Sequence, residues 1–431
     1  NHKYGFISGA LKETFTAGTR ESLRTTEIID TFVTHKLWGF PIFFFLMWLM
    51  FYCTYAVGAY PQAWIEAGVE WLGGLVQRMM PDGVLKDLLT EGVIGGAGSV
   101  IVFLPNIMIL YLFISFMEDS GYLARAAFIM DRVMHRMGLH GKSFIPLVMG
   151  FGCNVPAIMA TRTIESFSSR LITILIMPFM SCSARMPIYI LLVGAFFPSH
   201  PGAVMLGLYA LGILLAMFTA KQIMRRFLFR IDETPFVMEL PPYRMPTWRA
   251  TLSHMWEKCA QYLRKMGGMI LIASVIVWFL SYYPRTEAAE PRADAYASSY
   301  LGQVGKACEP VFEPLGLNWK AAVALVSGVA AKEIVVSTIG VLYAGEETTA
   351  DADSEKAGTE PLAARLAASG DFTTASALAF LVFILIYFPC VATVSAIATE
   401  AGWRWAAISI VYNTLLAWIV SFLVYHLANC F

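Results

Sequence analysis

The sequence predicts an all-α, polytopic membrane protein built from two inverted repeats, with re-entrant or broken helices at membrane depth. Hydrophobic residues make up 57% of the 431 residues and charged residues 14%. The mean hydropathy is +0.61, which is too apolar for a soluble protein of ordinary composition. Glycine, proline and cysteine interrupt two apolar stretches, at 150–157 and 177–187. Because backbone polar groups in hydrocarbon need internal partners, such interruptions are typical of half-helices that line a transport site.

The first 36 residues are polar, and the apolar positions within 23–33 have helical spacing. This pattern predicts an amphipathic helix on the cytoplasmic membrane face, with a soluble linker helix as the alternative. The chain begins at Asn1 without an initiator methionine or a signal peptide, so we expect it to be the C-terminal part of a longer protein. Pro41 then lies in the first turn of the first crossing, a favourable position for proline.

Charge-free runs of roughly 20 residues are long enough to cross a bilayer. Two further apolar runs, Ser143–Thr161 and Ala321–Gly345, are interrupted by glycine and proline or by the charged pair Lys332 and Glu333. The predicted crossings are Pro41–Ile65, Val93–Met117, Leu171–Ala184 continued past Arg185 to Phe197, Gly202–Ala220, Met266–Pro284, Phe372–Thr399 and Trp405–Phe431.

Lysine and arginine gather in four clusters, within 125–142, 162–170, 221–230 and 249–265. The positive-inside rule places all four clusters in the cytoplasm. A full crossing between the first two clusters would put the second and the third outside. We therefore predict that Ser143–Thr161 is re-entrant and returns to the face from which it started.

A weak internal repeat relates the two halves of the chain. Residues 147–154 can be aligned with 325–332, and 179–184 with 387–392. In this alignment Cys182 recurs as Cys390, whereas Cys153 becomes Ala331. Inverted repeats whose broken helices meet at mid-membrane are a common plan of secondary transporters.

The charge pattern and the repeat together predict how the chain is divided. The acidic segment between the two parts of the second repeat is expected on the external side of the membrane, either as a disordered insertion or as a weak cation-attracting funnel. The predicted divisions are a cytoplasmic linker with the amphipathic helix (1–36), the first span and an external segment (37–90), repeat 1 (91–230), a connecting segment with one span (231–318), and repeat 2 (319–431) with the acidic loop at 344–371.

Three cysteines lie at the predicted helix breaks and are the candidate metal ligands: Cys153, Cys182 and Cys390. Thiolate and thioether sulfur are soft donors, which suit Fe(II), Cu(I) or Zn(II) better than Mg²⁺ or Ca²⁺. The alternative is that a cysteine is only a small buried hydrophobic residue. We hold that alternative for the four cysteines outside the breaks, which are Cys53, Cys259, Cys308 and Cys430.

Further residues near these cysteines are second-line candidates for the metal path. Met149 and Met186 are each four residues from a cysteine, which would place them on the same helical face, although packing is the more common reason for such spacing. Asn154 could offer a carbonyl ligand or bond to freed backbone. Ionisable residues inside a membrane are expensive and are usually functional or mutually paired. The second-line set is Asn154, Met149, Ser181, Met186, Lys332 and Glu333.

Other chemistry is excluded by the motifs. The seven cysteines contain no CxxC pair, and no HExxH or GxSxG sequence occurs. Residues 138–143 resemble the end of a phosphate-binding loop, but Arg136 stands where that loop needs glycine. We therefore predict a transporter domain without catalytic residues, cofactor-binding residues, a nucleotide site or a nucleic-acid partner.

The residues around the breaks resemble ferrous iron transport protein B, the bacterial Fe(II) importer. The similarity covers nearly the whole chain and makes the two repeats Gate modules. The segments that carry it are Ile29–Asp30, His35–Lys36 and Gly39–Phe43; Phe103–Asn106 and Glu118–Tyr122; Gly150–Arg162 and Pro178–Pro187 in the first Gate; and Lys332–Glu333 and Tyr387–Thr393 in the second.

The resemblance implies Fe²⁺ as the substrate and the bacterial cytoplasmic membrane as the location. By the same resemblance, Cys153, Cys182 and Cys390 stand at the family's proposed metal-pathway cysteines. It also implies an N-terminal domain before residue 1 that binds GTP with Mg²⁺ and gates transport. Further implied partners are the lipid bilayer, a small FeoA-like cytoplasmic protein, and a second copy of the protein in a homo-oligomer.

Three alternatives stay open at this point. The first is transport of Mn²⁺ or another divalent metal. The second is a nucleoside-type organic solute transporter, because Gate modules also resemble those of nucleoside carriers and a nucleoside pocket needs aromatic and amide side chains. The third is an intramembrane thiol oxidoreductase, which would require a disulfide between Cys153 and Cys182.

Overall fold

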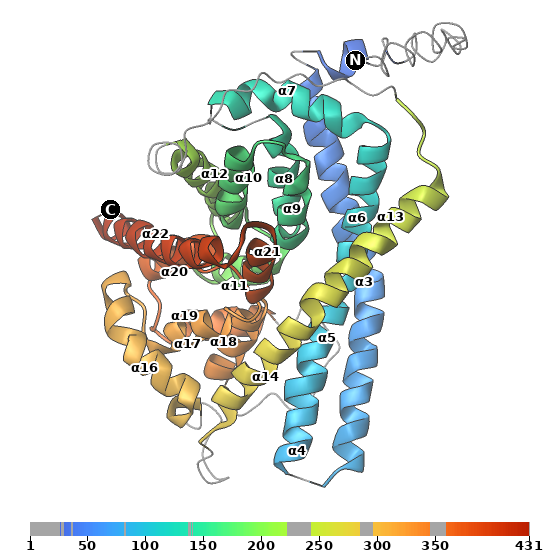
Figure 1. Cartoon of the computed structure of the whole chain (residues 1–431). Helices are drawn as coiled ribbons and strands as arrows, with labels where there is room; N and C mark the ends of the chain where they lie inside the picture. Colours follow the sequence, from blue (N-terminus) through green and yellow to red (C-terminus); the bar gives the residue numbers. More distant parts are fainter. Residues whose placement is uncertain are drawn as a thin grey trace, which may run out of the picture.

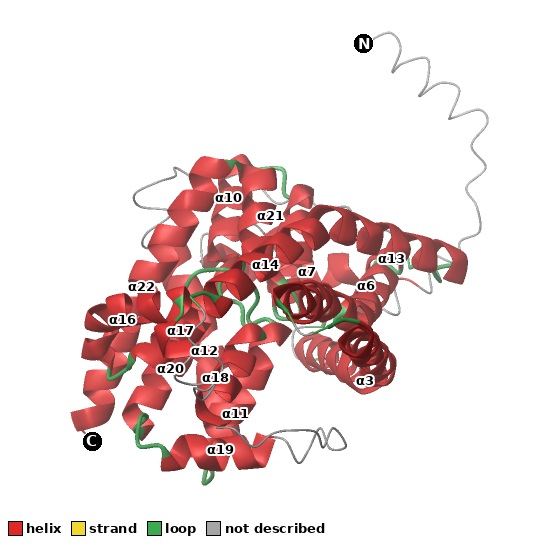
Figure 2. Cartoon of the chain, turned by 90° about the horizontal axis from the view of Figure 1, so that it is seen from below, coloured by secondary structure: helices red, strands yellow, loops and turns green. Residues whose placement is uncertain are grey.

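The computed structural model is helical throughout the residues that it describes. These are residues 30–35, 38–81, 83–136, 141–221, 243–284, 296–344 and 359–430, with Thr26 and Leu139 as isolated positions. Within them the chain forms helices and loops and no strand (Figure 2). Five described helical segments are long and apolar enough to cross a membrane, and a sixth counts if one bent helix pair is a single span. The prediction of an all-α, polytopic membrane protein is confirmed.

A helical hairpin forms one side of the molecule (Figure 1). Its first arm is α3 (Gly39–Met79), a continuous helix of 41 residues, which at about 1.5 Å per residue is roughly 60 Å long. The predicted first crossing, which ended at Ile65, is therefore only part of this helix. The second arm returns through α4 (Val84–Asp87), η1 (Leu88–Ile94), α5 (Gly95–Val102) and α6 (Leu104–Asp119).

The helix α7 (Tyr122–Arg136) turns sharply away from α6, with 81° between the two axes. Gly121 makes the corner with a φ of 83°, a conformation that glycine adopts without strain. Arg125 on α7 is fully buried; it donates to both Asp30 carboxylate oxygens, at 2.8 and 3.1 Å, and lies over the Tyr243 ring. The basic segment of the first cluster thus lies across the end of the helix bundle, along the upper edge of Figure 1.

A second long helix crosses the molecule diagonally, in yellow in Figure 1. It consists of α13 (Trp248–Tyr262), a π-helical turn η7 (Leu263–Gly267) and α14 (Gly268–Tyr282) without a break. The predicted crossing in this region began only at Met266, because the polar residues of α13 hide the continuity of the helix in the hydropathy.

Four broken helices form the centre of the protein. The predicted breaks at Cys153 and Cys182 are confirmed, since both residues have extended backbone between two helical segments. The pairs are α8 (Phe144–Gly150) with α9 (Asn154–Ala160); α10 (Phe167–Ile176) and η4 (Met177–Phe179) with η5 (Ser183–Arg185) and α11 (Met186–Phe196); α17 (Trp319–Ser327) with α18 (Ile334–Ala344); and α20 (Thr374–Ile386) with α21 (Val391–Ala401).

The remaining helices surround this centre. They are η2 (Gly141–Ser143), η3 (Thr161–Thr163), α12 (Pro201–Phe218), α16 (Tyr300–Phe312), η8 (Glu313–Leu315), α19 (Thr359–Ala368) and α22 (Trp403–Cys430). The helix α19 corrects the prediction of a loop over 344–371, because its residues form a helix that packs on α11 and buries Leu366. The rest of the acidic segment, 345–358, and most of the predicted linker 1–36 lie outside the described residues.

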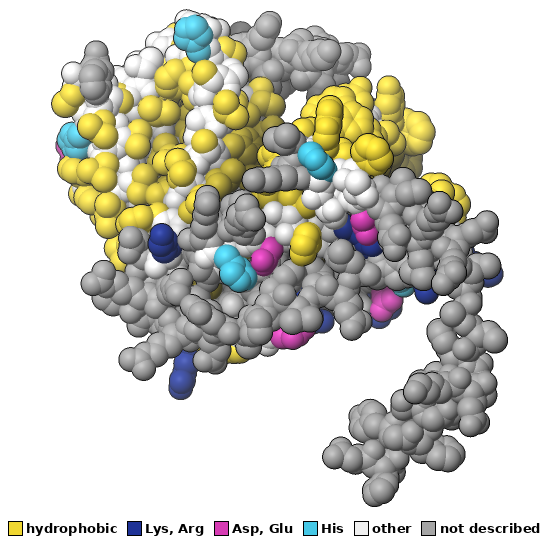
Figure 3. Space-filling view, turned by 90° about the horizontal axis from the view of Figure 1, so that it is seen from above, with side chains coloured by type: hydrophobic (Ala, Val, Ile, Leu, Met, Phe, Trp, Pro, Cys, Tyr) yellow, Lys and Arg dark blue, Asp and Glu magenta, His cyan; other side chains and the backbone are white. Residues whose placement is uncertain are grey.

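Burial distinguishes central from peripheral helices. Every residue of α20 except Thr374 and Leu378 is buried, whereas α22 exposes Leu415, Ile419 and Leu423 along one side. Exposed apolar faces of this extent mark a surface that meets lipid. From above, charged side chains lie mainly across the lower half of the picture and hydrophobic ones cover most of the upper half (Figure 3).

The close approach of α12 to the second break gives a first testable prediction. A Cβ on the buried Gly212 would lie 2.7 Å from the Phe179 carbonyl oxygen, whereas one on Gly207 of the same helix would meet nothing within 4 Å. We expect Gly212→Ala to lower the melting temperature, with an overpacking cost of about 1–3 kcal/mol, and Gly207→Ala to leave it unchanged. Equal melting temperatures of the two purified variants would contradict this packing.

Candidate metal pathway

The four helix breaks meet at one cavity of about 110 Å³. Each break contributes residues to its wall, and α3, α6, α13 and α14 close the remaining sides. The lining from the breaks is Gly152, Cys153, Asn154 and Val155; Cys182, Ser183, Ala184 and Arg185; Ala330, Ala331, Lys332 and Glu333; and Pro389, Cys390, Ala392 and Thr393. We call this space the thiol cavity, because all three predicted cysteines border it.

The size of the thiol cavity restricts what it holds. One water molecule takes up about 30 Å³ of liquid, so the cavity accommodates a metal ion with a few waters. Pockets for organic ligands are usually about 300–1,000 Å³. In this conformation the space fits an ion rather than a nucleoside.

Backbone hydrogen bonds join the breaks in pairs, and the two donors come from aligned positions of the two repeats, whereas the two acceptors differ by one position. The residue after Cys182, Ser183, donates its N–H to the Gly152 carbonyl at 3.2 Å. The residue after Cys390, Val391, donates its N–H to the Val329 carbonyl at 3.1 Å. These bonds satisfy backbone groups that the breaks leave without helical partners. The predicted repeat, and the inversion of one repeat relative to the other, stay predictions.

Two basic side chains bind carbonyl oxygens at the breaks. Arg185 is buried and donates to Met180 O at 3.3 Å and to Pro178 O at 3.1 Å. Lys332 is buried as well; its Nζ donates to Phe388 O at 2.7 Å and lies 3.2 Å from the centre of the Tyr387 ring. The breaks before Cys182 and Cys390 are therefore each held by a basic residue within hydrogen-bonding distance.

The three cysteines are free thiols. The Cys390 sulfur lies 3.1 Å from the Thr393 hydroxyl. Among the described residues, no three histidine, cysteine, aspartate or glutamate side chains are close enough together to form a ready-made metal site. The cavity brings the thiols to one space without assembling them as a fixed ligand set.

The second-line candidates divide into two groups. Asn154, Lys332 and Glu333 line the thiol cavity, and the buried Asn154 Oδ1 has no hydrogen-bond partner. The others lie outside the lining: the Ser181 hydroxyl donates to the Tyr189 hydroxyl and the Met186 sulfur accepts from Tyr209. Met149 borders a different, larger cavity.

Sequence reasoning missed Arg185 as a site residue, although a signal for it existed. It is a charged residue within an otherwise charge-free run, and such residues are functional or paired by default. Thr393 and Tyr262, which also line the cavity, carry no comparable signal because hydroxyl and aromatic residues are common in membrane helices.

The larger cavity has a volume of about 610 Å³ and lies beside α7, α9 and α13. Its walls carry Glu118, Asp119, His254 and Glu257, and Lys258 donates to Glu118 there at 3.0 Å. Glu118 and Asp119 thus line a space at the end of α6 that carries several charged side chains. Met149, on the helix that precedes Cys153, borders this cavity, so α8 and its break lie between the two spaces.

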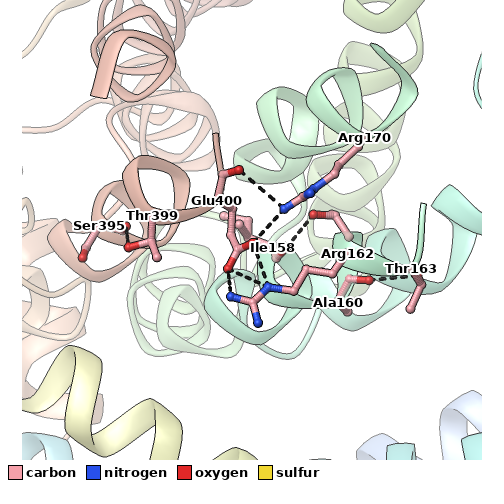
Figure 4. A network of polar contacts seen from close by, with 9 residues as sticks. Ile158, Ala160, Arg162, Thr163, Arg170, Ser395, Thr399 and Glu400 are labelled. Carbon is pink, nitrogen blue, oxygen red and sulfur yellow. Dashed lines mark hydrogen bonds and ion pairs between the residues drawn. The ribbon is translucent and has the colours of Figure 1, made fainter. Parts of the chain in front are cut away.

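An ion cluster joins the end of α9 and the helix α10 to α21 on this side (Figure 4). Arg162 after α9 and Arg170 on α10 both bind the carboxylate of Glu400, at the end of α21. The Arg170 contact is 2.7 Å and one Arg162 contact is 2.8 Å. The Glu400 side chain is only 4% exposed, against 27% for Arg170 and 52% for Arg162.

The fold and the cavity define a polytopic α-helical transporter domain in which broken helices surround a small thiol-lined space. A family model described as Gate, nucleoside recognition, matches residues 100–196 and 263–404, together more than half of the chain. A second model, described as ferrous iron transport protein B C terminus, matches residues 205–258.

Curated relatives agree with these matches. The Fe(2+) transport protein A/Fe(2+) transporter FeoB fusion protein of Porphyromonas gingivalis is 54% identical, over all of this chain and 55% of that protein. The Fe(2+) transporter FeoB of Campylobacter jejuni is 42% identical over 95% of this chain and 66% of its own length. The Methanocaldococcus jannaschii protein of the same name is 39% identical over 99% of this chain and 62% of its own length.

The chain belongs to the ferrous iron transport protein B family. It spans between 55% and 66% of the length of the three relatives described above. No solved structure matches it.

Proposed function

We propose that this chain is the membrane domain through which Fe²⁺ enters a bacterial cell across its cytoplasmic membrane. The observation that carries the proposal is that Cys153, Cys182 and Cys390, at three separate helix breaks, border one cavity of ionic size. Sulfur is a suitable donor for Fe(II) and a poor one for Mg²⁺ or Ca²⁺. Relatives named Fe(2+) transporter FeoB support the same cargo.

The arrangement suits transit rather than storage. Conduction requires binding that is strong enough to admit an ion and weak enough to release it. Thiols that share a cavity without forming a ready-made ligand set meet this requirement, because no single position provides full coordination. The ion would then pass Met149 into the larger cavity, where Glu118 and Asp119 offer oxygen ligands near the cytoplasm.

We infer that an upstream domain, which binds GTP with Mg²⁺, controls this path in the longer parent protein. The curated relatives extend well beyond the matched region, and one is a fusion with Fe(2+) transport protein A, which favours a small protein of that kind as a partner. Asp30 joins the first described segment to the buried Arg125 of α7. Movement of the upstream chain would thus reach α7 and the larger cavity directly. The lipid bilayer and a second copy of the protein are the remaining expected partners.

The proposal is tested by metal uptake in bacteria that lack their own Fe(II) importer. We expect the parent protein to restore uptake of Fe(II) under anaerobic conditions, with Mn(II) and Zn(II) offered separately to determine selectivity. If the cells take up Mn(II) and neither Fe(II) nor Zn(II), the protein is a manganese transporter. Uptake of no metal, together with uptake of a nucleoside, would replace the proposal by the organic-solute function that the Gate description suggests.

A further inference from the structure

The two basic residues of the thiol cavity act at equivalent places in the two repeats. When Cys182 is aligned with Cys390, Met180 corresponds to Phe388. Arg185 donates to the Met180 carbonyl and Lys332 donates to the Phe388 carbonyl. In each repeat, the carbonyl oxygen two residues before the cysteine is therefore bound by a basic side chain. The two donors come from different sequence positions, so the shared feature is the contact itself.

Carbonyl oxygens at helix breaks are the usual ligands of hard cations inside membranes. Broken helices of secondary transporters coordinate Na⁺ with such unwound carbonyls, and Ca²⁺ and Mg²⁺ also prefer oxygen donors. A break that presents free carbonyls beside a thiol would bind a hard cation as well as it binds Fe²⁺. These hard cations are far more abundant than free Fe²⁺ around a bacterial cell, so an oxygen site in the path would be occupied by the wrong ion.

We propose that Arg185 and Lys332 determine cation specificity by occupying these carbonyl oxygens. The carbonyl oxygens of Pro178, Met180 and Phe388 accept hydrogen bonds from the side-chain N–H groups of Arg185 and Lys332. With these three oxygens engaged, the thiols are the distinctive donors of the adjoining cavity. This inference deepens the proposed function and rests on it for the identity of the cargo.

Both side chains are fixed where they are. Arg185 is 1% exposed, and its guanidinium bridges two carbonyls of the same break. Lys332 is fixed by the Tyr387 ring, and the Tyr387 hydroxyl in turn donates to Leu325 O at 3.3 Å. A cation held over an aromatic face in a site with little water gains more from the contact than an exposed one. A mobile hard cation would have to displace a group that the protein supplies permanently.

The test replaces Lys332 by methionine in the parent protein. This variant keeps the length of the side chain and frees the Phe388 carbonyl. We expect Ca²⁺ and Mg²⁺ to inhibit Fe(II) uptake by the variant at concentrations at least about tenfold lower than those that inhibit the unmodified protein. Altering groups around a metal site commonly changes metal affinity by about 10–100-fold. Lys332→Arg, which can still donate, should keep the original resistance. Lys320→Met is the matched control, because Lys320 pairs with Asp371 outside the cavity.

A direct binding measurement keeps the test decisive if Lys332→Met no longer transports. Purified parent protein and variant are dialysed against radioactive calcium, and bound calcium is counted. We expect retention by Lys332→Met and none above background by the unmodified protein or by Lys320→Met. Unchanged inhibition with unchanged calcium binding in Lys332→Met would overturn the inference. If the unmodified protein takes up no Fe(II), the proposed function fails, and the calcium result still decides the role of Lys332.

Discussion

Cys182→Ser is expected to reduce Fe(II) uptake at least about tenfold at unchanged protein abundance. Cys182 lies in extended backbone at a break and borders the thiol cavity. Serine is nearly the same size, so the packing around the break is retained. It replaces a soft sulfur donor by a hard oxygen that binds Fe(II) less well. Changes to groups that only support a metal site already cost 10–100-fold, and the loss of a donor should cost no less.

The three cavity cysteines should behave as one group. Cys153→Ser and Cys390→Ser are expected to give losses of similar size, because each thiol comes from a different break. The control is Cys308→Ser on α16, a partly buried cysteine that does not border the cavity. Uptake is measured in the importer-deficient cells, with abundance followed by immunoblotting. Full uptake by Cys153→Ser and Cys182→Ser would refute the thiol pathway, whereas a loss of abundance would indicate packing.

Glu400→Gln is expected to loosen the contact between the two Gate segments and to destabilise the protein. The Glu400 carboxylate lies at the C-terminal end of α21, where the helix dipole disfavours a negative charge. The negative charge of Glu400 is stabilised at this helix end because Arg162 and Arg170 both bind the carboxylate. Removing the charge leaves two arginines facing one neutral amide. We expect a cost of about 1.5–3 kcal/mol, the range for hydrogen bonds to charged groups, and a lower melting temperature in detergent.

Single and double variants show whether this cluster acts as a unit. Arg170→Gln should cost more than Arg162→Gln, because Arg170 is less exposed and exposed ion pairs contribute little. Combined with Glu400→Gln, Arg170→Gln should add much less than it costs alone, since the contact is already lost. Lys142→Gln is the matched control, because its partner Glu165 is largely exposed. Fully additive effects of Glu400→Gln and Arg170→Gln would contradict a shared cluster.

The positions of the helix breaks could be predicted from the sequence. Glycine and proline around Cys153 and Cys182 cannot continue a helix in hydrocarbon without new partners for the backbone, and the structure has breaks at both places. Local chemistry was sufficient for these breaks. In Ser143–Thr161 the break separates the short helices α8 and α9, and the return of this segment to its starting face stays a prediction.

Contacts between distant segments could not be predicted. Arg162 and Glu400 are separated by 238 residues, and nothing in either local sequence indicates the other. The continuous helix through α13 and α14 was missed because hydropathy records composition, not helix length. The helix α19 was missed because acidic neighbours dominate its segment, although Leu366 packs inside the protein. The placement of Met149 beside the larger cavity, and not in the lining of the thiol cavity, likewise depends on where α8 ends.

The most direct test of the central claim is protection of the thiols by Fe(II) in the purified parent protein. The protein is treated anaerobically with a small alkylating reagent, with and without Fe(II), and the modification of each cysteine is measured by mass spectrometry. We predict that Fe(II) slows alkylation of Cys153, Cys182 and Cys390 and leaves Cys308 unchanged, while Mg²⁺ protects none of them. Two results would contradict this account: Fe(II) protects Cys308 as much as the cavity cysteines, or Fe(II) protects no cysteine. In either case iron does not bind these thiols on its way through the membrane.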